Sequence, residues 1–364
     1  MKLIIDARFL GLEHAGIGRY TKGLIEYLKP PESWEVVLIV NKDHAHDPKI
    51  AKYRLIVTKY HPYSFLSQFE LIYLLSREKP DLLHVPHFTI PLLWRGKMVV
   101  TIHDLIKHES KGKNTTTRSP LLYWIKYLGY LTTVFVAIKK ASQILVPSKY
   151  WKNKLKEKYG SHLPITVTYE GVDEIYFMAG HPLEIALKKP YVIYIGNVYP
   201  HKNVETIIKA ITTLKGEIHL YISCARSVFW KRLEEIIHKE NAWDFVTHLG
   251  FVADENLVWL LKNSLSFVTA SKIEGLGLPG LEAMAAGTAV ISSNSSCLPE
   301  IYGNAASYFD PDNALELAQK IVYMQKHPQE RKKMVERGKN QVKRYSWGRM
   351  SEQTVAIYKQ AMDL

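Results

Sequence analysis

The chain has 364 residues, 47% hydrophobic and 23% charged, which is typical of a globular protein with room for two cores. Lys and Arg (48) outnumber Asp and Glu (35), so the formal net charge of +13 favours an anionic partner, although a solvated lysine-rich surface explains it equally well. Two cysteines exclude a disulfide framework and a cysteine-based zinc site and fit a reducing, cytoplasmic compartment, and no apolar run is long enough to span a membrane.

Short apolar runs alternate with helical patterns through the first half of the chain. The N-terminal MKLIIDARFL is read as a first strand, because its apolar stretch is too short for a signal peptide. We expect buried strands at 2–7, 34–40, 53–58, 81–86, 98–104 and 143–148, with helices such as Tyr20–Leu28 and Phe65–Arg77 between some of them. This alternation predicts a parallel sheet covered by helices.

A second series of strands and helices follows a stretch, residues 171–184, in which periodicity lapses. Its expected strands are 191–196, 217–223, 246–250, 265–270 and 288–293, and its expected helices lie at about 203–214, 228–240, 255–262, 279–286 and 313–325. The fold class is therefore α/β, with two doubly wound, Rossmann-like domains facing an interdomain cleft. We place the domains at 1–175 and 185–340, with an amphipathic helix over 345–364 that crosses back to the N-terminal domain.

The segment EGLGLPGLE (274–282) contains the G-x-G-x-x-G pattern of dinucleotide sites between an expected strand and an expected helix. Three features argue against NAD. The pattern lies late in the chain, the next strand ends in Ser292, Ser293 and Asn294 without an acidic ribose ligand, and Glu274 would repel a pyrophosphate.

Glutamates flank these glycines on both sides, which suggests a different nucleotide. A carboxylate holds vicinal hydroxyls well, since each oxygen accepts a charge-assisted hydrogen bond. Glu274 and Glu282 could hold a sugar and a ribose, while the amides of Gly277 and Leu278 meet the diphosphate between them. A sugar nucleotide fits this arrangement better than a dinucleotide.

The longer segment EGLGLPGLEAMAAGTAVISSNSSCLPE (274–300) resembles the retaining glycosyltransferases of family 4, which have the GT-B architecture. Glu274 and Glu282, with seven residues between them, match the family's paired-glutamate spacing. The resemblance covers most of the chain and includes 16–24, 100–105, 143–155, 194–203, 248–252 and 308–313. The motifs GIGRY, TIHDL and PHKN are most similar to the mannosyltransferase-like branch that acts on polysaccharide or O-antigen chains.

The resemblance implies roles for individual residues of the second domain. Glu282 is expected to accept the ribose hydroxyls, Glu274 to hold hydroxyls of the transferred sugar, and Lys202 to meet the diphosphate. Many family members add an arginine where this chain has Asn197, so the phosphate clamp is either weaker here or completed by His201 or another cation. Without the resemblance, these residues would pass for surface or capping groups.

In the first domain the resemblance points to His103, at the end of an expected strand, as a contact of the donor sugar. Asp104 is expected to orient its imidazole or to cap the next helix. A glycine-rich loop in GLEHAGIGRY (11–20) is expected to let backbone approach donor or acceptor at Gly16 and Gly18. Arg8 and Arg19 either add positive charge there or are structural.

The implied reaction is transfer of a hexose, with mannose from GDP-mannose favoured, from a nucleotide-sugar to an acceptor hydroxyl with retention. Both glutamates are then occupied, so we expect a front-face reaction in which the departing diphosphate accepts the proton of the incoming hydroxyl. No acidic metal motif is present, so the enzyme is expected to need no metal ion and no cofactor besides its GDP- or UDP-linked donor.

The acceptor class is a glycan or a lipid-linked glycan. Residues 121–140 are favoured as a core helix with lysines at its C-terminus, followed by a solvated amphipathic helix over the lysine-rich 149–159. The alternative is peripheral docking of these segments on anionic lipid at the inner face of the cell membrane. Two other functions stay open. They are an NAD-linked oxidoreductase and a basic nucleic-acid-binding protein, although nucleic acid is not the expected partner.

Overall fold

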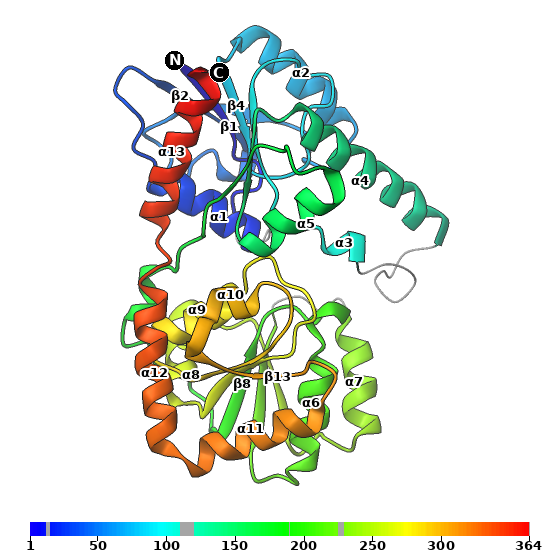
Figure 1. Cartoon of the computed structure of the whole chain (residues 1–364), viewed down its shortest axis with the longest axis vertical. Helices are drawn as coiled ribbons and strands as arrows, with labels where there is room; N and C mark the ends of the chain where they lie inside the picture. Colours follow the sequence, from blue (N-terminus) through cyan, green and yellow to red (C-terminus); the bar gives the residue numbers. More distant parts are fainter. Residues whose placement is uncertain (12–14, 110–119, 189, 225–228, 364) are drawn as a thin grey trace. The chain divides into compact units, whose positions relative to one another are not determined.

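The computed structural model describes residues 1–11, 15–109, 120–188, 190–224 and 229–363, and these form two compact units (Figure 1). Unit 1 draws on residues 1–105, 116–171 and 346–364, and unit 2 on 106–115 and 172–345. The chain therefore passes from unit 1 to unit 2 after Gly171 and returns after Tyr345. The C-terminal helix belongs to the same unit as the N-terminus.

Unit 1 is built on a seven-stranded parallel sheet in the order β3-β2-β1-β4-β5-β6-β7. Its strands are β1 (Lys2–Asp6), β2 (Glu35–Asn41), β3 (Arg54–Thr58), β4 (Leu82–Val85), β5 (Met98–Thr101), β6 (Gln143–Val146) and β7 (Ile165–Val167). The central strands are continuous apolar runs, such as EVVLIVN in β2, because helices cover both faces of a parallel sheet. The order of strands reverses between β1 and β4.

The helices of unit 1 lie on both sides of this sheet (Figure 1). They are α1 (Ala15–Glu26), α2 (Leu66–Glu78), α4 (Pro120–Lys140), α5 (Lys149–Tyr159) and α13 (Trp347–Asp363), with a 3₁₀ turn η2 at Lys42–His44. Helices α1 and α13 share one core with the sheet, which includes Leu24 and Ile25 of α1 and Trp347 and Tyr358 of α13. The last helix thus completes the hydrophobic core of unit 1.

Unit 2 has a six-stranded parallel sheet in the order β10-β9-β8-β11-β12-β13, which reverses between β8 and β11. The strands are β8 (Tyr191–Ile195), β9 (His219–Ser223), β10 (Val246–Gly250), β11 (Ser266–Thr269), β12 (Val290–Ser293) and β13 (Ala306–Phe309). The helices and 3₁₀ turns are α3 (Ile106–Glu109), η4 (Glu174–Phe177), η5 (Pro200–Lys202), α6 (Val204–Thr213), α7 (Trp230–Lys239), α8 (Asp254–Asn263), α9 (Leu278–Ala285), α10 (Leu298–Tyr302), η6 (Gly303–Ala305), α11 (Ala314–Lys326) and α12 (Pro328–Val342).

The two parallel-sheet, Rossmann-like domains expected from the sequence are confirmed, and every expected strand is present. One expected helix begins in a different place. Helix α1 starts at Ala15 and not at Tyr20, so Gly16 and Gly18 lie in its first turns and not in a loop. Two edge strands, β7 and β13, were not predicted, because their short sequences, ITV and ASYF, are only partly buried and contain a polar residue each.

Candidate functional site

The strongest cluster of expected site residues lies where the strand order of unit 2 reverses. Lys202 ends the turn η5 that follows β8, and Glu274 lies in the loop that follows β11. The Lys202 Nζ donates to both carboxylate oxygens of Glu274, at 2.7 Å each. Ligands of doubly wound sheets bind at this carboxyl edge, where strand order reverses, so the pair lies at the place that topology predicts for a ligand.

The Glu274 carboxylate is buried and firmly held. Its Oε1 also accepts the hydroxyl of Ser271 at 2.7 Å, and its backbone N–H donates to the hydroxyl of Ser296. Burial raises the pKa of Glu274, but the Lys202 ammonium and the Ser271 hydroxyl outweigh burial, so the net pKa of this carboxyl is lowered. The group is therefore an anion whose lone pairs face a cation and a hydroxyl, both of which a polyhydroxylated ligand could replace.

The neighbouring His201 does not supply the extra cation that the sequence suggested. Burial and the adjacent Lys202 ammonium lower the pKa of His201 to about 4, so the imidazole is neutral near pH 7. Asn197 follows the same strand, is half-buried, and its carbonyl accepts the hydroxyl of Tyr194 at 2.6 Å. Lys202 is therefore the cation that this segment offers to a phosphate.

Helix α9 begins beside the Lys202–Glu274 pair, and its glycines have a packing role. Gly277 caps the helix with φ of 88°, a left-handed conformation that suits glycine, and its carbonyl accepts the hydroxyl of Tyr302 at 2.5 Å. A Cβ at Gly277 or Gly280 would collide with the Tyr302 side chain. Both glycines therefore bring α10 against the start of α9, and Leu278, the first helical residue, is buried there.

Glu282 lies in α9 and is only 2% exposed, which excludes the reading of an ordinary surface glutamate. Buried carboxylates are uncommon unless they are paired or serve a ligand. The ribose role expected for Glu282 stays a prediction, and its burial in the helix that follows the Glu274 loop agrees with that role.

Aromatic side chains gather beyond the carboxyl ends of β8, β9 and β10. Trp230 stacks on His248 with ring centroids 3.6 Å apart, and Tyr199 contacts both His201 and Phe229. The loop that follows β9, which ends at Ser223, lies at this edge of the sheet. Part of that loop, 225–228, lies outside the described residues.

In unit 1, His103 follows β5 and both of its ring nitrogens have partners. Nδ1 lies 3.0 Å from Oε1 of Glu170, and Nε2 lies 3.1 Å from the carbonyl oxygen of Pro86. Glu170 is therefore a carboxylate that orients the imidazole, and the role expected for the half-buried Asp104, orienting the imidazole or capping the next helix, stays a prediction. The sequence analysis missed Glu170, whose signal was a carboxyl group just before the stretch 171–184 in which periodicity lapses.

The glycines of α1 do not form the expected loop for a ligand. A Cβ at Gly18 would lie within 3.3 Å of the carbonyl oxygen of Phe9, and closer to that of Gly11. The lack of a side chain at Gly18 therefore lets the backbone of residues 9–11 pack against α1. Gly16 is exposed with open space around it, and Arg19 is half-buried.

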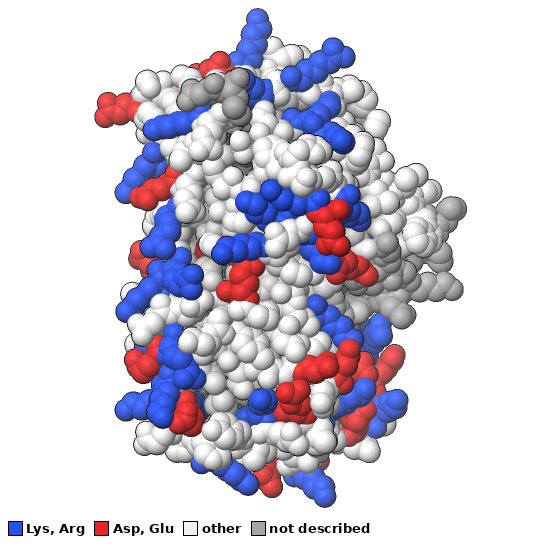
Figure 2. Space-filling model, viewed as in Figure 1, with Lys and Arg blue, Asp and Glu red and all other residues white. Residues whose placement is uncertain are grey.

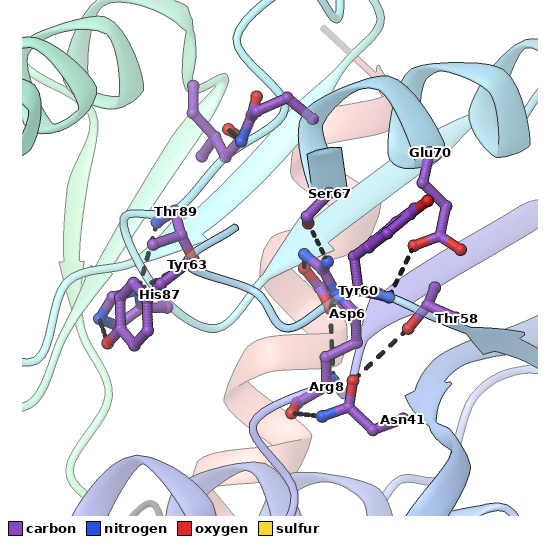
Figure 3. A network of polar contacts seen from close by, with 12 residues as sticks. Asp6, Arg8, Asn41, Thr58, Tyr60, Tyr63, Ser67, Glu70, His87 and Thr89 are labelled. Atoms are coloured by element: carbon purple, nitrogen blue, oxygen red, sulfur yellow. Dashed lines mark hydrogen bonds and ion pairs between the residues drawn. The ribbon is translucent and has the colours of Figure 1, made fainter. Parts of the chain in front are cut away.

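Arg8 is fully buried and cannot add positive charge to a ligand site (Figure 3). Its guanidinium donates to both carboxylate oxygens of Asp6, each at 2.7 Å, and to the hydroxyl of Ser67. Asn41 donates from its side-chain amide to the Arg8 carbonyl at 2.7 Å. Arg8 therefore joins the end of β1 to the first turn of α2 and has a structural role.

Within the described ranges, no three His, Cys, Asp or Glu side chains are grouped so that they could hold a metal ion. The same part of the chain contains no helix with the length and apolar character needed to cross a membrane. Independence from metal ions stays a prediction.

Two family models match the chain. The model described as "Glycosyl transferases group 1" matches residues 181–341, and "Glycosyltransferase Family 4" matches residues 14–175. The chain is 32% identical over 173 residues to O-antigen chain mannosyltransferase B of Escherichia coli, across 46% of this chain and 45% of that protein. It is 26% identical over 270 residues to O-antigen chain mannosyltransferase RfbU of Salmonella typhimurium, across 73% of this chain and 70% of that one. The match thus spans less than half of the Escherichia coli protein.

Solved structures share the fold at low sequence identity. Sucrose-phosphate synthase from Thermosynechococcus elongatus has a TM-score of 0.77 at 18% identity, covering 99% of this chain and 98% of that one. Anabaena Alr3699/HepE in complex with UDP and glucose has a TM-score of 0.76 at 16% identity, covering 99% and 100%. These likenesses confirm the fold class expected from the sequence.

Proposed function

Because the chain belongs to the group 1 and family 4 glycosyltransferases, with the GT-B fold, we propose that it moves a hexose from a nucleotide-sugar to a hydroxyl of a glycan or lipid-linked acceptor. The observation that carries the proposal is the Lys202–Glu274 pair where the unit 2 sheet reverses its strand order. The relatives named O-antigen chain mannosyltransferases support mannose as the transferred sugar. We propose GDP-mannose as the donor, for cell-surface polysaccharide. An NAD-linked oxidoreductase is disfavoured, because the Glu274 carboxylate would repel the pyrophosphate of NAD.

The proposed reaction retains the configuration of the transferred carbon and uses no metal ion. Glu282 holds the ribose, the Lys202 ammonium and the first amides of α9 hold the diphosphate, and Glu274 accepts hydroxyls of the sugar. The bond between the anomeric carbon and the diphosphate oxygen breaks as the acceptor oxygen bonds to the same face of that carbon. The departing diphosphate takes the acceptor proton. His103 contacts the transferred sugar, and the chain contributes positioning and stabilisation of phosphate charge.

A panel of GDP, UDP, ADP, dTDP and NAD in thermal unfolding tests this proposal. One nucleoside diphosphate at a hundred times its dissociation constant should stabilise the domain by about 2.7 kcal/mol, and Glu282→Ala should abolish that shift. The matched control is Glu235→Ala, which removes an exposed glutamate from α7 of the same unit and should leave the shift intact. A shift with NAD alone, or an unchanged shift in Glu282→Ala, would contradict the assignment.

We also propose that the protein meets its acceptor at a membrane surface, because α4 exposes large apolar side chains. The sequence analysis favoured a core helix, but Trp124, Ile125, Leu128 and Phe135 are between 51% and 66% exposed. In Figure 2 the surface where α4 lies is largely white, with both basic and acidic side chains beside it. Helix α5 is amphipathic as expected, since it buries Trp151 and Leu155.

Helix α2 and the loop after β4 extend this apolar surface of unit 1. Phe65, Phe69 and Leu93 are between 58% and 76% exposed, and Lys140 of α4 donates to the carbonyls of Leu92 and Trp94. Aromatic and aliphatic side chains with lysines among them suit an anionic lipid surface, where rings enter the headgroup region and ammonium groups meet phosphates. Docking there would supply a lipid-linked acceptor.

Replacing two exposed side chains of α4, Trp124→Ser with Leu128→Ser, is expected to weaken binding to anionic vesicles about tenfold or more at low salt. Leu315→Ser is the matched control, because Leu315 is 61% exposed on α11 of unit 2. Co-sedimentation with vesicles of anionic lipid, compared with zwitterionic ones, measures the effect. Equal binding by the double variant and the wild type would remove α4 from the docking surface.

A further inference from the structure

The imidazole of His103 is held by polar contacts that its sequence motif does not reveal. Its imidazole lies between two oxygens, the Glu170 carboxylate at Nδ1 and the Pro86 carbonyl at Nε2. The side chains of His103 and Glu170 are 11% and 7% exposed, so little water competes for these contacts. The ring of Tyr20 packs edge-on against the imidazole, with centroids 4.7 Å apart.

These two partners select one protonation state of the ring. A carbonyl oxygen and an ionised carboxylate only accept hydrogen bonds, and a neutral imidazole has one N–H to donate. A neutral ring would leave one nitrogen lone pair facing an oxygen lone pair. The doubly protonated ring donates to both, and its charge is balanced by Glu170 in a charge-assisted bond.

The neighbouring His84 does not bring a second positive charge to the ring of His103. The Nε2 atom of His84 forms a hydrogen bond with the Thr101 hydroxyl, 2.9 Å away, and the same hydroxyl forms a hydrogen bond with the Tyr20 hydroxyl. Burial and the nearby His103 lower the pKa of His84 to about 3, so His84 is neutral.

Packing fixes the backbone that carries Glu170. The next residue, Gly171, lies against α13, and a Cβ there would come within 2.7 Å of the Ser346 carbonyl carbon and would also collide with Trp347. Two residues before Glu170, the N–H of Thr168 donates to the carbonyl of Val146 in β6. The carboxylate is therefore presented by a short segment held on both sides.

We propose that Glu170 is a positioning residue that keeps His103 in one orientation and in its doubly protonated, cationic form while the sugar is transferred. The inference rests on the proposed function in so far as His103 contacts the transferred sugar. The carboxylate would act through the imidazole and would not itself touch substrate. Since both N–H groups are engaged by Glu170 and Pro86, the cationic imidazole acts there through its charge, which stabilises negative charge that develops on nearby sugar or phosphate oxygens.

The test compares Glu170→Gln and Glu170→Ala with the wild type. We expect kcat to fall roughly tenfold to a hundredfold in both variants, because a reacting group is misplaced, while the donor KM changes much less. Imidazole nitrogen NMR at pH 7, with the His103 signals identified from a His103→Gln sample, should find protons on both ring nitrogens in the wild type and on one in Glu170→Gln.

Glu78→Gln is the matched control, because Glu78 also carries an ion pair in unit 1, with Lys2 and Arg54, and lies at the end of α2. It should leave kcat and the His103 signals unchanged. A wild-type ring with one proton, or full kcat in Glu170→Gln, would overturn the inference. Failure of the wild type to transfer sugar from any donor would instead contradict the proposed function, and the NMR comparison would still decide whether Glu170 sets the state of His103.

Discussion

Glu274→Gln is expected to lower turnover by a hundredfold or more and, in the same protein, to strengthen binding of the free nucleoside diphosphate. Hydrogen bonds to a charged group are each worth about 1.5–3 kcal/mol, so losing the charge in two bonds to the sugar gives an effect of that size. The second effect has a different origin. Lys202 donates to both oxygens of Glu274, and a neutral amide leaves that ammonium available to the diphosphate.

Steady-state kinetics with the donor named by the thermal panel, and calorimetry with the matching nucleoside diphosphate, measure the two effects separately. Glu336→Gln is the control, since Glu336 pairs with Lys339 on the exposed face of α12 and should change neither quantity. Weaker binding of the diphosphate by Glu274→Gln would mean that the pair supports the phosphate site and does not compete with it. Unchanged turnover would mean that Glu274 does not contact the transferred sugar.

The sequence predicted the frame of both sheets because buried parallel strands are continuous apolar runs. YVIYIG and QILVPS are examples, and the structure places strands at Tyr191–Ile195 and Gln143–Val146. The edge strands β7 and β13 were not predicted because they are only partly buried, so their sequences, ITV and ASYF, are not continuous apolar runs. The start of α1 was misplaced because glycines at 16 and 18 argue locally against a helix, whereas Gly18 is needed there for close contact with residues 9–11.

The site was predicted less completely than the fold. Motif spacing predicted that Lys202, Glu274 and Glu282 bind one ligand. In the structure all three follow strands or lie on the helix at one sheet edge. Motif spacing does not reveal which groups pair when no ligand is bound, or that His201 is neutral, since both depend on distance and burial. Glu170 belongs to no pattern, and only the fold brings it to His103, 67 residues earlier.

Arg8 illustrates how burial decides between a functional and a structural role. In the sequence it follows the first strand, where a cation could serve an anionic ligand. In the structure its side chain is 0% exposed and that of Asp6 is 2% exposed, so neither charge reaches solvent. The pair compensates its loss of hydration through two hydrogen bonds between the partners and one to Ser67. Removing one partner leaves the other charged, buried and unpaired.

Arg8→Met is therefore expected to destabilise unit 1 by about 3–5 kcal/mol, whereas the double variant Asp6→Leu/Arg8→Met should recover most of that loss, since an apolar pair leaves no unpaired charge. Arg54→Met is the control, because Arg54 is 46% exposed in its ion pairs and should cost less than about 1 kcal/mol. Urea unfolding measures the three values, and nucleoside diphosphate affinity monitors unit 2, because two domains can unfold in separate transitions. If Arg8→Met kept its stability and lost diphosphate affinity instead, Arg8 would be a ligand group and its buried pairing with Asp6 would not describe the working protein.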